Sequence, residues 1–194
     1  MTARKLPRRR AEQGALLIEV LVAIVICAFG LLGFAALQAR ATTTEFESYQ
    51  RSQALVLISD MTNRINSNRA VAASYVVDGL IGADGLEDCA GKTSAALDLC
   101  QWGNLIRGSA ETRNGSRVGS MMQARGCIAL APGTSDRYVI SIIWQGVVPT
   151  GAPPMTPCNA DAVIADAKLR RVVSSTVCMA RLRDPDVLPP TPRC

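Results

Sequence analysis

Cysteines are the residues of this chain whose type and number could do chemistry, because the sequence contains seven of them and no histidine. Without histidine, the chain cannot form a histidine-based catalytic triad, a histidine general base or a zinc site that needs imidazole. The cysteines also lack the Cys-x-x-Cys spacing of thioredoxin-like redox motifs and zinc ribbons. The sequence shows no convergent nucleophile and base, so we expect a protein that is not an enzyme and has no cofactor or metal.

Glu19 is the one charged residue in a long apolar run from Ala15 to Leu37. As a helix this run would extend about 35 Å, enough to cross a hydrocarbon core of about 30 Å. Residues 1–14 carry five basic side chains and one acidic one, and they account for most of the overall charge of +5. The positive-inside rule therefore predicts a membrane span with its N-terminus in the cytoplasm and the rest of the chain across the membrane.

Two simpler interpretations of this segment are a cleaved secretory signal peptide and an ordinary single-pass anchor. Ala39-Arg40-Ala41 would supply a site of the kind that signal peptidase cuts. The apolar run, however, is longer than the roughly 7 to 15 residues usual in signal peptides. Neither interpretation explains Glu19, since an acidic side chain in a spanning helix costs about 2.5 to 3.5 kcal/mol and normally needs a partner.

Residues 13–37, QGALLIEVLVAIVICAFGLLGFAAL, resemble the class III signal of type IV pilins and type II secretion pseudopilins. In that family a basic leader ends in Gly, an apolar helix follows directly, and Glu occupies the fifth mature position. The matching residues here are Gly14, Ala15 as the first mature residue, and Glu19, although many members have Phe in place of Ala15. Residues 13–75 are more closely similar to PilV-like minor pilins, also called type IV pilus modification proteins, through GLLGFAALQARA and SQALVLISDMTNRINSNRAVAASY.

This resemblance implies a minor pilin, a structural subunit of a type IV pilus that acts near the tip or in the initiation complex. It implies cleavage between Gly14 and Ala15 by prepilin peptidase, methylation of the new amine, and a role for Glu19 in assembly. The implied partners are other minor pilins, the major pilin, prepilin peptidase and the lipid of the inner membrane. The head would lie in the periplasm, and would be extracellular once the subunit is assembled in the pilus.

Two alternatives stay open. One is a minor pseudopilin of a type II secretion system, which shares the signal and the fold. The other is a pilus-tip adhesin or DNA-binding module, which would use a set of dispersed arginines: Arg107, Arg113, Arg117, Arg125 and Arg137. These arginines lie among acidic residues and lack interleaved aromatic side chains, so we expect no nucleic acid as a partner.

The elements that must position these residues follow from hydrophobic periodicity. One stripe of a helix would carry Ala54, Leu57, Ile58, Met61 and Ile65. No proline interrupts residues 15–69, so we expect one long helix with a membrane half at 15–37 and an amphipathic half at 38–69. The stretch 70–117 is rich in Gly, Asp, Ser and Asn, which predicts a connecting loop with a turn at Asn114-Gly115.

Three extended segments are predicted at about residues 121–131, 137–148 and 169–183. In the second, Tyr138, Ile140, Ile142 and Trp144 share one face, the period of a strand covered on one side. The expected fold is α+β, with the long helix packed on an antiparallel sheet of three to four strands within residues 118–194. This is the layout of the pilin family that the chain resembles.

The cysteines divide between the predicted span and the translocated side. Cys27 lies inside the span, where we interpret it as a small apolar packing residue. The other six lie on the translocated side, where an even number predicts three disulfides. We favour three pairs: Cys89 with Cys100 in a short loop, Cys127 with Cys178 between two predicted strands, and Cys158 with Cys194 at the proline-rich C-terminus.

Overall fold

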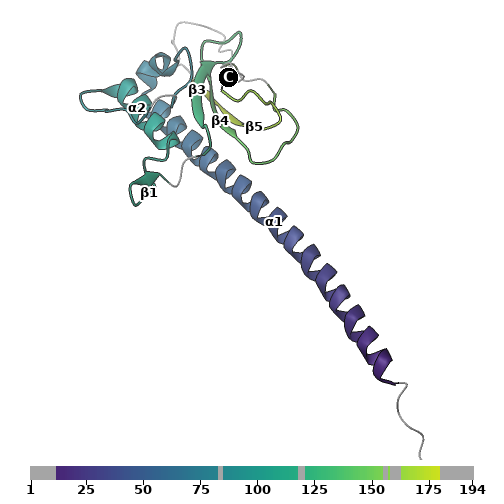
Figure 1. The fold of residues 1–194 in the computed structure, drawn as a ribbon. Coiled ribbons are helices and arrows are strands. Elements are labelled where there is room, and N and C mark those ends of the chain that lie inside the picture. Colours follow the sequence, from purple (N-terminus) through teal and green to yellow (C-terminus); the bar gives the residue numbers. More distant parts are fainter. Residues whose placement is uncertain (1–11, 83–84, 118–120, 155–156, 158–162, 180–194) are drawn as a thin grey trace, which may run out of the picture. The chain divides into compact units, whose positions relative to one another are not determined.

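The computed structural model describes residues 12–82, 85–117, 121–154, 157 and 163–179 of the chain (Figure 1). Its helices are α1 (Glu12–Ser67), the 3₁₀-helix η1 (Arg69–Tyr75) and α2 (Ser94–Ile106). Its strands are β1 (Thr112–Arg113), β2 (Ser116–Arg117), β3 (Arg125–Leu130), β4 (Arg137–Gln145) and β5 (Arg170–Cys178). The chain divides into two compact units, an N-terminal unit that ends at Phe46 and a head that begins at Glu47.

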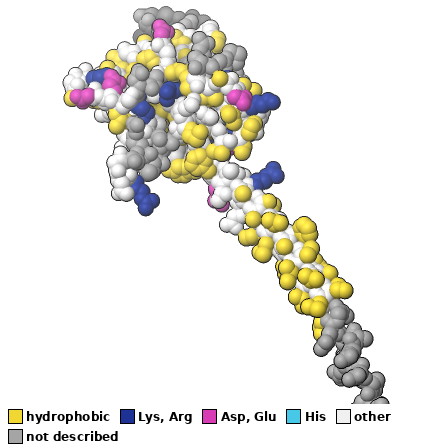
Figure 2. Space-filling view, in the orientation of Figure 1, with side chains coloured by type: hydrophobic (Ala, Val, Ile, Leu, Met, Phe, Trp, Pro, Cys, Tyr) yellow, Lys and Arg dark blue, Asp and Glu magenta, His cyan; other side chains and the backbone are white. Residues whose placement is uncertain are grey.

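The described part of the N-terminal unit is the first part of α1, and its side chains from residue 16 to residue 37 are exposed on every side of the helix. Figure 2 shows the apolar side chains, in yellow, along one face of this helix. The leucine, isoleucine, valine and phenylalanine side chains from Leu16 to Leu37 are between 50% and 71% exposed. By length and composition, this helix could cross a membrane. A helix that is apolar all round needs an apolar surrounding, and lipid provides one.

In the head, the remaining part of α1 packs as its periodicity predicts. The predicted stripe is buried throughout and consists of Ala54, Leu57, Ile58, Met61 and Ile65. It shares one hydrophobic core with side chains from the sheet, among them Ile128, Ile140, Ile142 and Trp144. Residues 47–67 of the long helix therefore supply one wall of the head's core, whereas residues 38–46 of the predicted amphipathic half belong to the N-terminal unit.

The sheet is antiparallel and has the strand order β3-β4-β5, the meander that the sequence predicts. The prediction that β4 is covered on one side only is wrong. Ile143 faces away from α1 and is fully buried in a second cluster with Cys127 and Ile164. The segment between β4 and β5 supplies Ile164, so both faces of the strand are covered.

The region 70–117 is more regular than the predicted connecting loop, because it contains α2. Trp102 of α2 is fully buried, and its Nε1 donates a hydrogen bond to the carbonyl oxygen of Leu57 at 2.8 Å. Gly126 of β3 makes room for this ring, since a Cβ at that position would lie 2.3 Å from Trp102. The helix and the sheet thus meet at a position where no larger residue than glycine fits.

The predicted turn at Asn114-Gly115 is confirmed. These two residues connect β1 to β2, and both have positive φ, 50° and 77°. Two successive residues with positive φ are typical of the tight hairpin turns that match the twist of paired strands.

Candidate functional site

The predicted cleavage site lies in the first turn of α1. The helix begins at Glu12, three residues before the predicted start at Ala15, so the peptide bond between Gly14 and Ala15 is helical. A protease that holds its substrate extended would have to unwind this turn. The first turn of a helix opens most easily, because its leading N–H groups have no partner within the helix.

Glu19 lies about 6 Å further along the helix axis than Ala15, since four residues separate them. Its side chain is exposed, as are the apolar side chains on either side of it. Among the described residues, none forms a hydrogen bond or an ion pair with Glu19. In an apolar surrounding this carboxylate would therefore need a partner from outside the described part of the chain.

The cysteines confirm one predicted disulfide and correct another. Cys89 and Cys100 form a disulfide with a Cα–Cα distance of 5.8 Å. Cys27, in the predicted span, is free and exposed. The predicted pair Cys158–Cys194 lies outside the described residues.

The predicted pair Cys127–Cys178 is wrong, although both cysteines are in disulfides. In the register of the sheet, Cys127 of β3 lies opposite Ser141 of β4, and Ser141 lies opposite Ser174 of β5. Cys178 is therefore displaced by four residues along its strand and lies two strand spacings away, a separation of about 16 Å. A disulfide requires Cα atoms within about 7 Å, so this register excludes a bond between the two.

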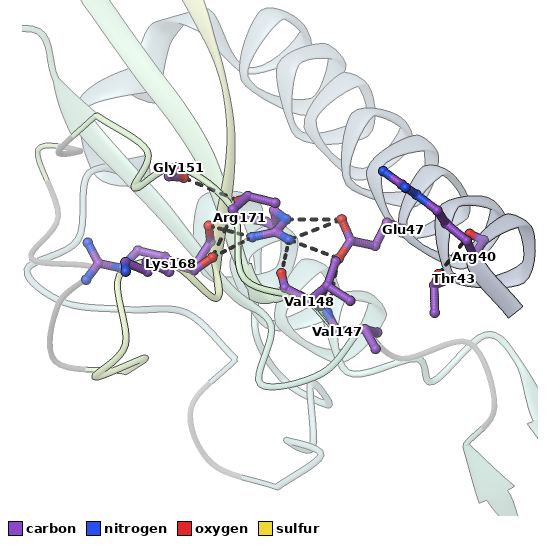
Figure 3. Close-up of polar contacts among 10 residues, drawn as sticks. Arg40, Thr43, Glu47, Val147, Val148, Gly151, Lys168 and Arg171 are labelled. Atoms are coloured by element: carbon purple, nitrogen blue, oxygen red, sulfur yellow. Dashed lines mark hydrogen bonds and ion pairs between the residues drawn. The ribbon is translucent and has the colours of Figure 1, made fainter. Parts of the chain in front are cut away.

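A carboxylate of α1 binds the sheet at the start of the head (Figure 3). Glu47 Oε1 accepts hydrogen bonds from Arg171 Nη2 at 2.9 Å and from the backbone N–H groups of Val147 and Val148 at 3.2 and 3.3 Å. Arg171 Nη2 also donates to the carbonyl oxygen of Val148 at 2.6 Å. We call these four residues the Glu47 clasp. It joins α1, β5 and the loop that follows β4.

Charge and packing both favour the Glu47 clasp. Burial works against ionisation of Glu47, but hydrogen bonds from Arg171 and Val148 and the positive charge of Arg171 outweigh it, so the pKa of Glu47 is lowered. Gly146 leaves space for the guanidinium, because a Cβ there would lie 2.6 Å from Arg171 Cζ. The sequence does not predict this contact, because neither the helical pattern around Glu47 nor the strand pattern around Arg171 relates one residue to the other.

A second polar cluster joins the C-terminal end of α1 to η1 and α2. Arg64 Nη1 donates to Asp98 Oδ1 at 2.9 Å, and the hydroxyl of Tyr75 donates to Asp98 Oδ2. Asn68 Nδ2 donates to the same Tyr75 oxygen at 2.8 Å. Burial, together with the bond to Asp98, raises the pKa of Tyr75 to about 12. These contacts hold α2, which also carries Cys100, against the long helix.

The described residues thus present two features that differ in kind: an apolar run in α1 that contains one carboxylate, Glu19, and a head whose polar contacts join its elements to each other. Comparison of the chain with protein-family models, with curated proteins and with solved structures gives no match.

Proposed function

We propose that this chain is a minor pilin, a non-catalytic structural subunit of a type IV pilus. Before assembly, the N-terminal part of α1 holds it in the inner membrane with the head in the periplasm. One observation carries the proposal: α1 is a single helix whose first part exposes apolar side chains on every side, while its last part packs on a three-stranded sheet. The exposed first part of such a helix suits contact with lipid or with other helices, and the last part packs on the head of its own chain.

The exposed apolar surface of α1 would have apolar neighbours both before and after assembly of a pilin subunit. In the membrane it faces lipid chains, and in a fibre it would face the corresponding helices of other subunits. Helices in an apolar surrounding associate mainly through packing, and small residues allow close approach. Gly30 and Gly33 fit this role, because a Cβ at either position would meet nothing within 4 Å apart from the adjoining backbone of its own helix, which leaves their surface open to a neighbour.

Glu19 gives this apolar surface a preferred register. Cleavage after Gly14 would create an amino group at Ala15, about one helical turn from the carboxylate. In an apolar bundle, a carboxylate and an ammonium each lower the cost of burying the other, whereas a misplaced neighbour leaves a charge unpaired. Burial of the unpaired Glu19 carboxylate therefore costs the isolated subunit free energy, and pairing with an ammonium group in the correct assembly lowers that cost.

The Cys89–Cys100 disulfide supports a head on the translocated side, because structural disulfides persist in oxidising compartments such as the periplasm. A minor pseudopilin of a type II secretion system would have the same signal and layout, so it is the second candidate. Among the residues of the head that the structure describes, no specific contact supports an adhesin or DNA-binding role.

Fractionation of a strain that produces the tagged chain tests the proposal. We expect the chain in the sheared fibre fraction together with the major pilin, and we expect it to disappear from that fraction when prepilin peptidase is deleted. Recovery with secretion-system components and absence from sheared pili would instead favour the pseudopilin.

A further inference from the structure

The hairpin formed by β1 and β2 carries the one Asn-Gly sequence of the chain at its tip, Asn114-Gly115. Both residues are exposed, and so are the two residues of β1 that precede them. A Cβ at Gly115 would meet nothing within 4 Å beyond its chain neighbours, which leaves this side of the turn open to water. Water therefore reaches both the side-chain amide of Asn114 and the backbone that follows it.

Few contacts hold the hairpin closed. Its strands pair at two positions only, Thr112 with Arg117 and Arg113 with Ser116. Among the described residues, β1 and β2 form a sheet of their own with no third strand beside them. A two-stranded hairpin of this kind is only marginally stable in water. Segments with few buried contacts open locally at a low cost in free energy, so the turn can open while the head stays folded.

The base of the hairpin is tied to the head on the side that precedes β1. Glu111 accepts hydrogen bonds from the hydroxyl of Tyr49 at 3.2 Å and from Gln53 Nε2 at 3.4 Å. Both donors lie on the part of α1 that belongs to the head. The turn can open without the loss of these contacts, because they lie outside residues 112–117.

We propose that Asn114 is a site of spontaneous deamidation through a cyclic imide formed with Gly115. The backbone nitrogen of Gly115 loses its proton to hydroxide and attacks Asn114 Cγ. A bond forms between this nitrogen and Cγ, the bond from Cγ to Nδ2 breaks, and Nδ2 leaves as ammonia with a proton from water. Water then opens the ring. Cleavage of the nitrogen–Cγ bond yields aspartate, and cleavage of the bond between the nitrogen and the backbone carbonyl carbon yields isoaspartate.

Glycine at position 115 favours this reaction for a steric reason. Ring closure brings the nitrogen of residue 115 within bonding distance of Asn114 Cγ, and glycine has no Cβ to crowd this approach. In the closed hairpin, Asn114 and Gly115 have positive φ of 50° and 77°, a geometry that the tight turn requires. The reaction needs the nitrogen to swing toward the side chain, so its rate depends on how often the hairpin opens.

Either product changes the tip of the hairpin. A neutral amide becomes a carboxylate next to Arg113. Isoaspartate also directs the main chain through Cβ and lengthens it by one carbon atom, so the two-residue turn no longer fits the pairing of β1 with β2. This inference does not rest on the proposed function, because the reaction requires only water and the exposed turn.

Peptide mapping by mass spectrometry of the full chain, incubated in detergent at pH 7 and at pH 8, tests the proposal. Deamidation appears as the mass increase from NH₂ to OH, and electron-transfer fragmentation distinguishes isoaspartate from aspartate. We expect Asn114 to lose its amide severalfold faster than Asn63, an exposed asparagine of α1 that is followed by Arg64. We expect both products, and a severalfold faster reaction at the higher pH because the attacking nitrogen must lose its proton.

Gly115→Ala separates ring closure from opening of the turn. It adds the Cβ that crowds ring closure, whereas alanine at positive φ weakens the closed turn and would by itself speed the reaction. A severalfold fall in the rate at Asn114 therefore reports ring closure. Gly133→Ala is the matched control, with a φ of 74° and nothing within 4 Å of its Cβ, and should leave that rate unchanged. Loss of the Asn114 amide no faster than that of Asn63 would overturn the proposal. Aspartate without isoaspartate, or an unchanged rate in Gly115→Ala, would also overturn it.

Discussion

Glu47 and Arg171 form an ion pair with an N–O distance of 2.9 Å across 124 residues of sequence. Glu47 lies on α1 and Arg171 on β5, so the pair fixes the long helix to the last strand of the sheet. The same carboxylate holds the N–H groups of Val147 and Val148. One side chain therefore contacts both the last strand and the loop that follows β4.

Acid should destabilise the head through Glu47. Its hydrogen bonds and the charge of Arg171 lower its pKa below the usual 4.5 despite partial burial. A carboxyl group with a lowered pKa stabilises the fold above its unfolded pKa, and this contribution is lost as the pH falls through the folded-state pKa. We expect Glu47→Gln to reduce stability by about 1 to 3 kcal/mol at pH 7. As the pH falls below 4.5 and through the lowered pKa of Glu47, the parent should then lose its advantage over the variant.

Thermal unfolding of the full chain in detergent, followed by circular dichroism, measures this effect. Glu45→Gln is the matched control, because Glu45 is exposed and belongs to the N-terminal unit. Equal losses in the two variants, or a Glu47→Gln effect that does not change with pH, would contradict the role of the Glu47 clasp.

Packing of Trp102 on Gly126 predicts a specific overpacking defect. A Cβ at Gly126 would lie 2.3 Å from the indole ring and 2.6 Å from Ile106 Cδ1. Gly126→Ala should therefore destabilise the head by about 1 to 3 kcal/mol. Gly151→Ala is the control, since a Cβ there meets nothing within 4 Å. Denaturant midpoints that do not differ between the two variants would show that α2 does not rest on β3 in this way.

Peptide mapping under non-reducing conditions should place Cys127 and Cys178 in two different disulfides. Cys89 and Cys100 are bonded to each other and Cys27 is free, so the remaining partners in the sequence are Cys158 and Cys194. Alkylation of the intact protein should modify one thiol, that of Cys27. A peptide linking Cys127 to Cys178 would be incompatible with the register of β3, β4 and β5.

Periodic patterns in the sequence predict the elements well, and contacts between distant elements poorly. The stripe from Ala54 to Ile65 reflects burial against one surface, so the local pattern is enough to predict it. The alternation in residues 137–145 predicts the strand β4 but not the cover on its second face, where Ile143 is buried. The helix α2 was missed because Gly, Asp and Ser surround it, although Ala95, Leu99, Trp102 and Ile106 have helical spacing.

The disulfide of Cys127 and the ion pair of Glu47 depend on strand register and on how the chain turns between strands. The hydrophobic pattern of a single strand carries no information about strand register or about the turns between strands. For the same reason, the short local pair Cys89–Cys100 was predicted correctly and the long-range pair Cys127–Cys178 was not.

Replacement of Glu19 should impair assembly while sparing insertion. Glu19→Val removes a charge from an apolar helix, so expression, membrane insertion and cleavage should stay close to those of the parent. Recovery in sheared fibres, or with other minor pilins, should fall severalfold because the charge pair that favours the correct register is gone. Glu45→Val is the matched control, since it also replaces an exposed glutamate of α1 by valine. Incorporation of Glu19→Val at the level of the parent would refute the pairing role even for a true pilin.

The mature N-terminus tests the central claim most directly. If the chain is a pilin subunit, prepilin peptidase cuts between Gly14 and Ala15 and leaves the whole apolar helix on the mature protein. Mass analysis of the N-terminal peptide, from protein made in a strain with an active type IV pilus system, should find methylated Ala15 as the first residue. A mature chain that begins at Thr42 would identify a conventional signal peptide, and an uncut chain would identify a simple anchor. Either result would contradict the account.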